Sequence, residues 1–292
     1  MIRRARREDI PLLTALWETC FGDARAYIAF FFQNRFSAAE AFLWEEGGAP
    51  VSALFLFPAC LCHGEKRYAA RYLYAACTAP AFRARGIMRR LIDAAARSCA
   101  ANGVDCIALV PAGEGLFRYY AGCGFQTAFF CETASLSRRK LELLSGGRDT
   151  SAFPLALSEM AAIRRQALHG RDYLDWDEAA LSYALAEHRY GGGDAAGTRT
   201  PAGAGYCLFH TAAGKDACFV QELLCSGEPG PLFSALLYAS GAHSFSVRAP
   251  VGMLPACAQA EKRAFGMLRP LSARAAHLLQ ELKYAYLGLS LG

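Results

Sequence analysis

The chain has 292 residues, of which 54% are hydrophobic and 12% aromatic, so it can bury a substantial core and is not a disordered polypeptide. This length allows two domains of ordinary size. The formal net charge is only +5, and the Lys and Arg residues are scattered in short clusters, whereas a nucleic-acid interface needs a continuous basic stripe with aromatic residues in it. The composition therefore argues against DNA or RNA as a partner.

The first residues show no secretion or membrane signal. The basic start from Met1 to Arg7 runs directly into Glu8 and Asp9 without an apolar segment. No stretch of the chain reaches the roughly 18 apolar residues that a bilayer-spanning helix needs. We therefore expect a cytoplasmic protein with no membrane partner, and the sequence leaves open whether it is a monomer or a homo-oligomer.

The first 62 residues are predicted to contain one strand, then two helices, and then a pair of strands. Ile2–Ala5 is a candidate strand, and a helix opens at Asp9, with a proline near its start where a missing N–H has little effect. A second helix is predicted over Asp23–Phe36, and its aromatic side chains either wall a substrate pocket or pack into the core. Ala41–Glu45 and Val51–Cys62 follow as an antiparallel pair joined by a glycine-containing turn.

A basic loop with one glycine follows the next strand, Lys66–Thr78. It lies just before a helix that begins at Ile87 and closes at Asn102-Gly103. The first N–H groups of a helix have no intrahelical partner, and a glycine there lets a ligand approach the backbone closely. Three arginines add charges suited to phosphate oxygens: Arg83, Arg85 and Arg89. The loop is either a phosphate cradle or a solvated, arginine-rich helix start.

A second motif lies one strand-helix unit later. Asp105–Val110 is a short apolar run closed by a proline, and it predicts a buried strand. A short helix-like piece follows, and then comes Tyr119-Tyr120-Ala121-Gly122-Cys123-Gly124-Phe125.

Together these motifs resemble the GCN5-related N-acetyltransferase (GNAT) superfamily. Arg83-Ala84-Arg85-Gly86-Ile87-Met88 matches its R/Q-x-x-G-x-G/A acetyl-CoA loop, and Tyr119–Phe125 matches its F/Y-Y-x-x-x-G-F element. Met88 departs from the usual small residue, and in this it is similar to the enhanced-intracellular-survival branch of tandem acetyltransferases. The resemblance implies an α/β fold with tandem GNAT-like domains, each a mixed, mostly antiparallel sheet flanked by helices.

The resemblance also implies an acetyl-CoA site. Its cofactor-binding residues would be Ala76, Cys77 and Thr78 beside pantetheine, Arg83, Ala84, Arg85, Gly86, Ile87, Met88 and Arg89 around the pyrophosphate, and Gly113 after the next strand. Tyr120 takes the position of the general acid for the CoA thiolate, with Tyr119 as the alternative if the register differs by one. Cys123 is not expected to act covalently, because direct transfer is usual in the family. No general base is visible, and a role for the carboxylate of Gly292 is in doubt because the third domain of that branch is missing.

The second half repeats the order of elements in the first. After a polar linker, Ser137–Arg148, strands are predicted at Gly205–Thr211 and Ala217–Cys225, then a helix at Leu232–Ser240 and a strand at His243–Arg248. We predict an N-terminal catalytic domain at 1–136 and a degenerate second copy at 151–292.

The second copy is expected to bind no CoA. Its counterpart of the phosphate loop, residues 227–232, contains Glu228 and no arginine. Its task would be to close one wall of the acceptor cleft, with Glu222, Asp175 and Asp177 as weak candidates for receiving a cationic substrate.

The 12 cysteines show no disulfide-like framework and read as small buried hydrophobes. Cys60, Cys62 and His63 hint at a metal site, but strand alternation explains their spacing equally well, and no further ligand pair is visible. No metal is predicted.

Two functional classes remain open. The first is an acetyl-CoA-dependent N-acetyltransferase that acts by direct transfer on a small-molecule or peptide amine. The second is a non-catalytic acyl-CoA-binding sensor or assembly module. The presence of both the loop and Tyr120 favours the enzyme, because a sensor needs only the loop.

Overall fold

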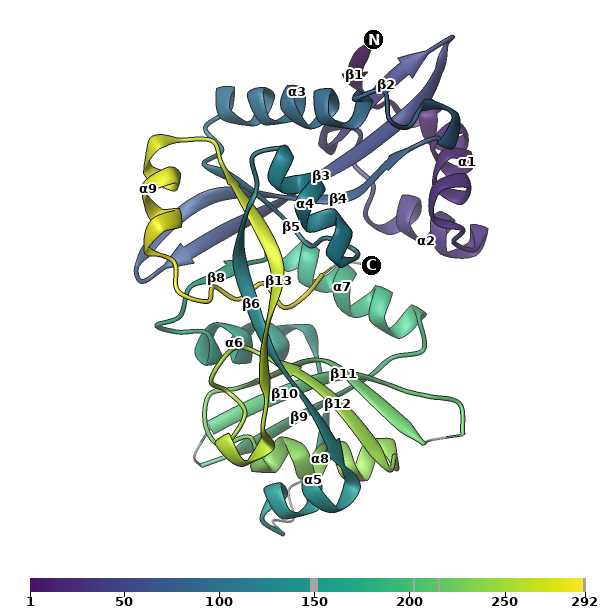
Figure 1. Ribbon diagram of the computed structural model, residues 1–292. Helices are drawn as coiled ribbons and strands as arrows, with labels where there is room; N and C mark the ends of the chain where they lie inside the picture. The colour runs from purple at the N-terminus through teal and green to yellow at the C-terminus, as the bar shows by residue number, and fades with distance from the viewer. Residues whose placement is uncertain (148–151, 202, 215, 291–292) are drawn as a thin grey trace. The chain divides into compact units, whose positions relative to one another are not determined.

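The structure is a computed structural model that describes residues 1–147, 152–201, 203–214 and 216–290. The chain divides into two compact units (Figure 1). Unit 1 comprises Met1–Leu61, Arg67–Thr127 and Met267–Glu281, and unit 2 comprises Cys62–Lys66, Ala128–Gly266 and Leu282–Gly292. The sequence-based domains assume contiguous stretches, whereas a late segment, Met267–Glu281, groups with unit 1 in the structure.

Unit 1 contains a sheet of order β1-β2-β3-β4-β5-β13. Pairing of β4 with β5 is parallel, and pairing of β1 with β2, β2 with β3 and β5 with β13 is antiparallel. Its elements are β1 (Ile2–Arg4), α1 (Ile10–Phe21), α2 (Arg25–Asn34), β2 (Ala41–Glu46), β3 (Ala49–His63), β4 (Lys66–Thr78), α3 (Ile87–Ala101), β5 (Cys106–Leu109), α4 (Glu114–Gly122), the end of β13 (Glu261–Pro270) and α9 (Ala273–Glu281).

The core of unit 1 follows from alternation along β3. Leu54 and Leu56 pack in a buried cluster with Leu91 of α3, whose apolar stripe is the one expected from its sequence. The alternate side chain Phe55 faces α1 and α2, where its ring lies 5.9 Å from that of Trp17 and 5.2 Å from that of Phe31. Of the aromatic side chains of the second helix, Phe31 is fully buried and Phe32 is nearly so, and both therefore belong to the core.

Unit 2 contains a sheet of order β6-β12-β11-β10-β9-β7, in which β11 and β12 are parallel. Its elements are β6 (Gln126–Ser137), α5 (Arg138–Ser145), β7 (Phe153–Pro154), α6 (Leu157–Ala167), β8 (Tyr173–Asp175), α7 (Glu178–Tyr190), β9 (Asp194–Thr200), β10 (Gly203–Thr211), β11 (Ala217–Cys225), α8 (Gly230–Ser240), β12 (Ser244–Ala249) and the start of β13. One buried cluster joins β10, β11 and β12 to α8, with Phe209, Val220, Phe233 and Val247 among its members.

The predicted fold class is confirmed, because both units are mixed, mostly antiparallel sheets flanked by helices. Gln126–Ser137 forms one continuous strand, β6. The prediction for the residues that follow it is wrong. The expected linker after it is largely the helix α5, capped by the Ser137 hydroxyl, which accepts from the Lys140 N–H at 3.2 Å; Arg148, its last residue, lies outside the described residues. Within the described residues, none of the helices combines the length and apolar character needed to span a bilayer.

Candidate active site

The candidate cofactor site of unit 1 begins where β4 and β5 stop pairing. Their parallel register joins Ala70–Tyr72 to Cys106–Ala108. β4 then continues for six more residues to Thr78, whereas β5 ends at Leu109. Two parallel strands that separate in this way leave backbone amides on their facing edges, and an extended ligand can pair with them.

A backbone irregularity lies in this part of β4. Ala75 has φ +47°, in the left-handed region, in the middle of a strand. This conformation costs an alanine roughly 1–2 kcal/mol, and such strain concentrates at functional sites. Nothing in the sequence signals it, because the residue is alanine and not glycine.

Hydrogen bonds from β3 and from the following loop fix the end of β4. The buried Ser52 hydroxyl donates to the Cys77 carbonyl at 2.8 Å and lies 2.9 Å from the Thr78 hydroxyl. The Arg83 Nε donates to the Thr78 carbonyl at 3.0 Å. Ala76, Cys77 and Thr78, the residues predicted to lie beside pantetheine, are therefore held on one firmly anchored segment.

The loop from β4 to α3 has the geometry of an anion-binding turn. Gly86 is the residue before α3 and has φ +71°, with open space where a side chain would begin. Ala84 is also left-handed, at φ +60°. Successive turns of this kind direct backbone N–H groups toward one point, at the positive end of the helix dipole.

Side chains around this loop separate into exposed and packed groups. Arg83, Arg85 and Arg89 are exposed, whereas Ile87 is buried and Met88 packs against the core of unit 1. Arg85 lies 3.4 Å from Glu46 in an exposed ion pair, which contributes little to stability. The three arginines thus lie at the surface, as Gly86 does.

The α4 helix supplies the candidate proton donor. It follows Gly113, which has an extended backbone (φ −174°). Tyr120 is 9% exposed, and its ring lies 5.7 Å from that of Phe125. Burial raises the pKa of Tyr120 to about 12, with a smaller contribution from Cys123, so the phenol is protonated at neutral pH and can donate.

Two reactive side chains near Tyr120 in the sequence, Tyr119 and Cys123, have different surroundings. Tyr119 is 41% exposed, and desolvation raises its pKa above the ordinary value. Desolvation also raises the pKa of the buried Cys123 thiol, which makes it a poor nucleophile.

Unit 2 differs at the equivalent positions. The connection from β11 to α8 has four residues, 226–229, whereas the connection from β4 to α3 has eight, 79–86. β12 is followed by a short 3-10 turn at Ala256–Ala258 where β5 is followed by α4. A cleft of about 480 Å³ lies beside this short connection, and the exposed Glu228 is among its lining residues.

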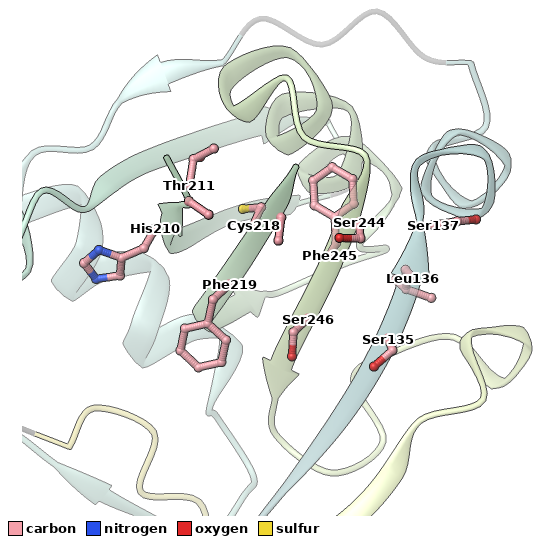
Figure 2. Close-up of a pocket in the computed structure, with 12 residues that line it drawn as sticks. Ser135, Leu136, Ser137, His210, Thr211, Cys218, Phe219, Ser244, Phe245 and Ser246 are labelled. Carbon is pink, nitrogen blue, oxygen red and sulfur yellow. The ribbon is translucent and has the colours of Figure 1, made fainter. Parts of the chain in front are cut away.

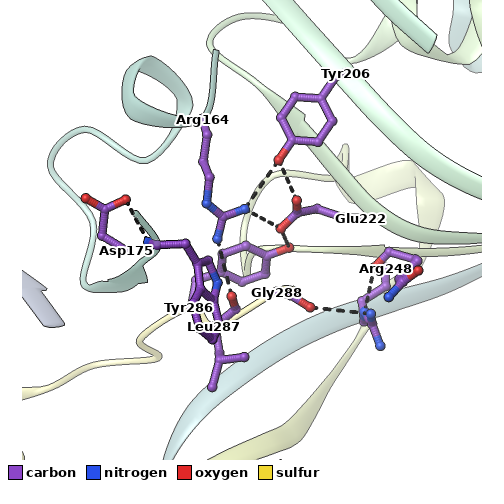
Figure 3. A network of polar contacts seen from close by, with 10 residues as sticks. Arg164, Asp175, Tyr206, Glu222, Arg248, Tyr286, Leu287 and Gly288 are labelled. Atoms are coloured by element: carbon purple, nitrogen blue, oxygen red, sulfur yellow. Dashed lines mark hydrogen bonds and ion pairs between the residues drawn. The ribbon is translucent and has the colours of Figure 1, made fainter. Parts of the chain in front are cut away.

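Glu222 is not available to receive a cationic substrate. It is fully buried and accepts from Arg164 Nη1 at 2.7 Å, from the Tyr206 hydroxyl at 2.5 Å and from the Tyr286 hydroxyl at 3.0 Å (Figure 3). Arg164 Nη2 also donates to the Leu287 carbonyl at 3.3 Å. Of the other two weak candidates, the Asp177 carboxylate accepts from the Ala180 N–H and caps α7, and the Asp175 carboxylate accepts from the Trp176 N–H.

The network around Glu222 also fixes the C-terminal segment of unit 2. Gly288 has φ +70°, and a Cβ there would collide with Glu222 and Tyr286. Arg248 Nη2 donates to the Gly288 carbonyl at 3.4 Å. Gly292, whose carboxylate was considered for the reaction, lies outside the described residues.

A second cavity of unit 2, of about 570 Å³, lies on its sheet. Its lining includes four serines (Ser135, Ser137, Ser244 and Ser246), His210 and Phe219 (Figure 2). Among the described residues that line it, none is Lys or Arg.

Comparison with known proteins finds a matching family model for the N-terminal part of the chain. Residues 1–128 match the family model described as acetyltransferase (GNAT) domain. A search of curated protein sequences finds no match.

Solved structures extend the likeness over nearly the whole chain. A GCN5-related N-acetyltransferase from Kribbella flavida is 17% identical, with a TM-score of 0.74 over 94% of this chain and 72% of that one. Eis1 from Mycobacterium abscessus is 13% identical, with a TM-score of 0.71 over 94% and 75%. A tandem GNAT protein from the clavulanic acid biosynthesis pathway is 13% identical, with a TM-score of 0.52 over 93% and 99%. The TM-scores show a common fold with these proteins, at identities too low to show more. Residues 1–128 thus match the acetyltransferase (GNAT) domain model, and the chain has the fold of tandem GNAT proteins.

Proposed function

We propose that unit 1 binds an acyl-CoA, with acetyl-CoA as the expected donor, and transfers its acyl group to an amine. One observation carries the proposal. β4 continues beyond its pairing with β5 and leads, through a glycine- and arginine-containing loop, to the N-terminus of α3. This arrangement offers backbone amides to an extended arm and a positive helix end to a phosphate group.

Each part of the donor would meet a different part of the loop and strands. The backbone of Ala76, Cys77 and Thr78 would pair with pantetheine, and Gly113 would flank it after β5. The pyrophosphate would accept from backbone N–H groups between Arg83 and Arg89, with the arginine side chains adding charge.

Tyr120 would act as the general acid. The protonated phenol would donate to the CoA sulfur as the bond to the acyl carbon breaks, and the amine would take the acyl group directly. The raised pKa of the Cys123 thiol argues against a covalent acyl-cysteine step. The acceptor is a small-molecule or peptide amine.

The alternative function is an acyl-CoA-binding module without chemistry. A thiol-release assay with acetyl-CoA and a panel of amines separates the two. The proposed enzyme releases CoA in proportion to an acetylated amine, whereas a binding module shows cofactor affinity with no amine-dependent release.

Gly86→Asp tests the donor site directly. A carboxylate at this position would oppose the pyrophosphate, and two like charges near a protein surface repel by about 4 kcal/mol at 4 Å. We expect acetyl-CoA affinity to fall at least about 10²-fold by calorimetry.

Gly103→Asp is the matched control. Gly103 has φ +73° and open space around it, as Gly86 does, but it lies after the other end of α3. It introduces the same backbone strain and the same charge away from the loop, so affinity should stay near the unsubstituted value. Equal affinities in both variants would refute the proposed site.

A further inference from the structure

The cavity of about 570 Å³ in unit 2 lies over the starts of the parallel strands β11 and β12 (Figure 2). This is the opposite end of β11 from its connection to α8. The volume falls within the range of roughly 300–1,000 Å³ that is usual for small-molecule sites. All of the described lining residues belong to unit 2, and the function proposed for unit 1 makes no use of them.

Strand register lines up a row of four different side chains across this face of the sheet. His210 of β10 pairs in register with Phe219 of β11, which pairs in turn with Ser246 of β12. Ser246 is directly opposite Ser135 of β6. Side chains of directly opposite residues lie on the same face of a sheet, so these four form one row, which Figure 2 shows in that order.

A second row, of small side chains, forms the floor of the hollow. Ala217 pairs in register with Ser244, and Ser244 with Ser137, two residues along the strands from the first row. The alternate residue Phe245 is buried in the core cluster with α8, on the other face of the sheet. The small second row beside the larger Phe219 therefore leaves the space that the cavity occupies.

The serines of the two rows have hydrogen-bonding capacity to spare. Ser135 and Ser246 are exposed, and their hydroxyls have no hydrogen-bond partner among the described residues. The Ser244 hydroxyl donates to a backbone carbonyl at 3.0 Å and can still accept. The Ser137 hydroxyl accepts from a backbone N–H at 3.2 Å and can still donate. The four hydroxyls thus offer donors and acceptors on strands spaced about 4.8 Å apart.

The other two members of the first row supply a ring face and an imidazole. Phe219 is 45% exposed. The Arg248 guanidinium lies 5.8 Å from the centre of its ring, and its Nε donates to the Gln221 carbonyl at 2.7 Å. Burial, and then the neighbouring His188, whose ring lies 4.4 Å away, lower the pKa of His210. The imidazole is therefore neutral at pH 7 and can both donate and accept.

The described lining of this hollow suits an uncharged ligand. Among the described residues that line it, none is Asp, Glu, Lys or Arg. A charged ligand that loses its hydration needs an opposite charge in return, whereas a hydroxyl-rich neutral ligand needs only hydrogen-bond partners. Sugar rings combine such hydroxyls with a face of C–H groups, which packs on the negative face of an aromatic ring.

We propose that this face of unit 2 binds a neutral carbohydrate, with one sugar ring stacked on Phe219 and its hydroxyl groups bonded to the polar side chains of the first row. The small second row lets the ring lie close to the sheet, where Ser244 and Ser137 reach the hydroxyls on its other edge. The site is independent of the function proposed for unit 1, whose donor-site residues lie elsewhere in the chain.

Saturation-transfer NMR on the full chain tests binding with neutral sugars as probes: glucose, galactose, N-acetylglucosamine and maltose. We expect at least one of them to give a saturable signal at millimolar concentration. Glucose 6-phosphate should bind no more tightly than glucose, because the described lining offers its phosphate no cation. Absence of binding by all of the neutral sugars, or markedly tighter binding of the phosphate, would overturn the proposal.

Two variants locate the site. Phe219→Ala removes the ring and should weaken binding of the sugar about 10-fold, and Ala217→Leu fills the hollow and should abolish it. Tyr238→Ala is the matched control, because Tyr238 is an aromatic residue of unit 2, 89% exposed, on the helix that packs on the other face of the sheet. Affinity should be unchanged in the control. Unchanged affinity in Phe219→Ala and Ala217→Leu as well would place the sugar elsewhere and overturn the proposal.

A second copy of the chain is the other candidate occupant of this face. Analytical ultracentrifugation of the unsubstituted chain and of Ala217→Leu distinguishes it from a sugar. The same oligomeric state in both, together with loss of sugar binding in the variant, supports the carbohydrate site. A dimer that Ala217→Leu converts to a monomer would make the face an interface between copies and overturn the proposal.

Discussion

The two units share one order of elements, but the connection between their parallel strands differs. Each has an antiparallel neighbour, a parallel strand pair and a helix that connects the pair, but the connection in unit 1 has eight residues and that in unit 2 has four. The longer connection contains two arginines and Gly86, whereas the shorter contains Glu228 and is followed by Pro231, which removes an N–H donor from the first turn of α8. A shared fold therefore does not imply a shared ligand site.

The two units also differ in how deeply one ion pair of each is buried. In unit 1, Asp105 pairs with Arg274, a side chain 60% exposed to solvent. In unit 2, Glu222 and Arg164 are both buried, at 0% and 1%. The Asp105 pair thus has one partner at the surface, whereas the Glu222 pair has both partners in the interior.

The largest expected effect comes from breaking the buried pair. Glu222→Gln keeps the size of the side chain but leaves the Arg164 charge buried without its counterion, which should lower the free energy of unfolding by about 3–5 kcal/mol. Urea denaturation followed by circular dichroism measures this. Glu228→Gln, at an exposed carboxylate of the same unit, is the control. A loss below about 1 kcal/mol at Glu222 would contradict a structural role for the network.

Tyr120→Phe should lower kcat by about 10²-fold and leave acetyl-CoA affinity nearly unchanged, because it removes a proton donor but keeps the buried ring. Amine-dependent thiol release and calorimetry measure the two quantities. This test sharpens the comparison, since the residues after β12 form only a 3-10 turn and no α4-like helix.

Tyr119→Phe is the control for this prediction. If it reduces turnover and Tyr120→Phe does not, the register of the acid is wrong by one residue. If neither does, the proton comes from elsewhere.

Asp105→Asn should have a smaller effect on stability than Glu222→Gln, and the effect should depend on pH. Hydrogen bonding to Arg274 lowers the pKa of Asp105 below its ordinary value of about 3.9. Stability from this carboxylate is therefore present above that value and is lost as the pH falls through the lower, folded-state pKa. Urea midpoints below pH 4 should fall less steeply in the variant, and parallel curves would contradict this.

The smallest expected effect is that of Glu228→Gln on acetyl-CoA binding, because we expect no second donor site in unit 2. Calorimetry should give one acetyl-CoA per chain, and Glu228→Gln should change neither that number nor the affinity. A stoichiometry of two would break the comparison, because unit 2 would then bind the donor without the arginines on which the unit 1 site depends.

The sequence predicts the strands that precede the two strand-helix connections better than it predicts their surroundings. The bounds of β4 and β11 agree with those expected, because apolar runs bounded by turn residues mark both strands. The helix α5 was missed because its charged residues resemble a linker, although Ser137 is a good N-cap. The burial of Glu222 could not be foreseen, since its partner Arg164 lies 58 residues away along the chain.

The candidate site also contains residues that the sequence identifies and a feature that it does not. Local spacing identifies the loop around Gly86 and the tyrosine pair on α4, because the chemistry depends on neighbours in sequence. The left-handed backbone of Ala75 depends on how the strands meet, and a single sequence carries no signal for it. The roles of these residues stay predictions until the variants are measured.

Unit 1 includes Met267–Glu281, a segment late in the chain, and this has a consequence for folding during synthesis. The outer neighbour of β5 is β13, whose Met267–Pro270 pairs with Cys106–Leu109. During synthesis, which runs at roughly 5–20 residues per second, the β5 edge has no partner until the ribosome has added about 160 more residues. An unpaired strand edge invites pairing with another chain. A gene fragment that ends after the GNAT domain match at residue 128 should therefore yield aggregated protein, and one that continues through α9 should not.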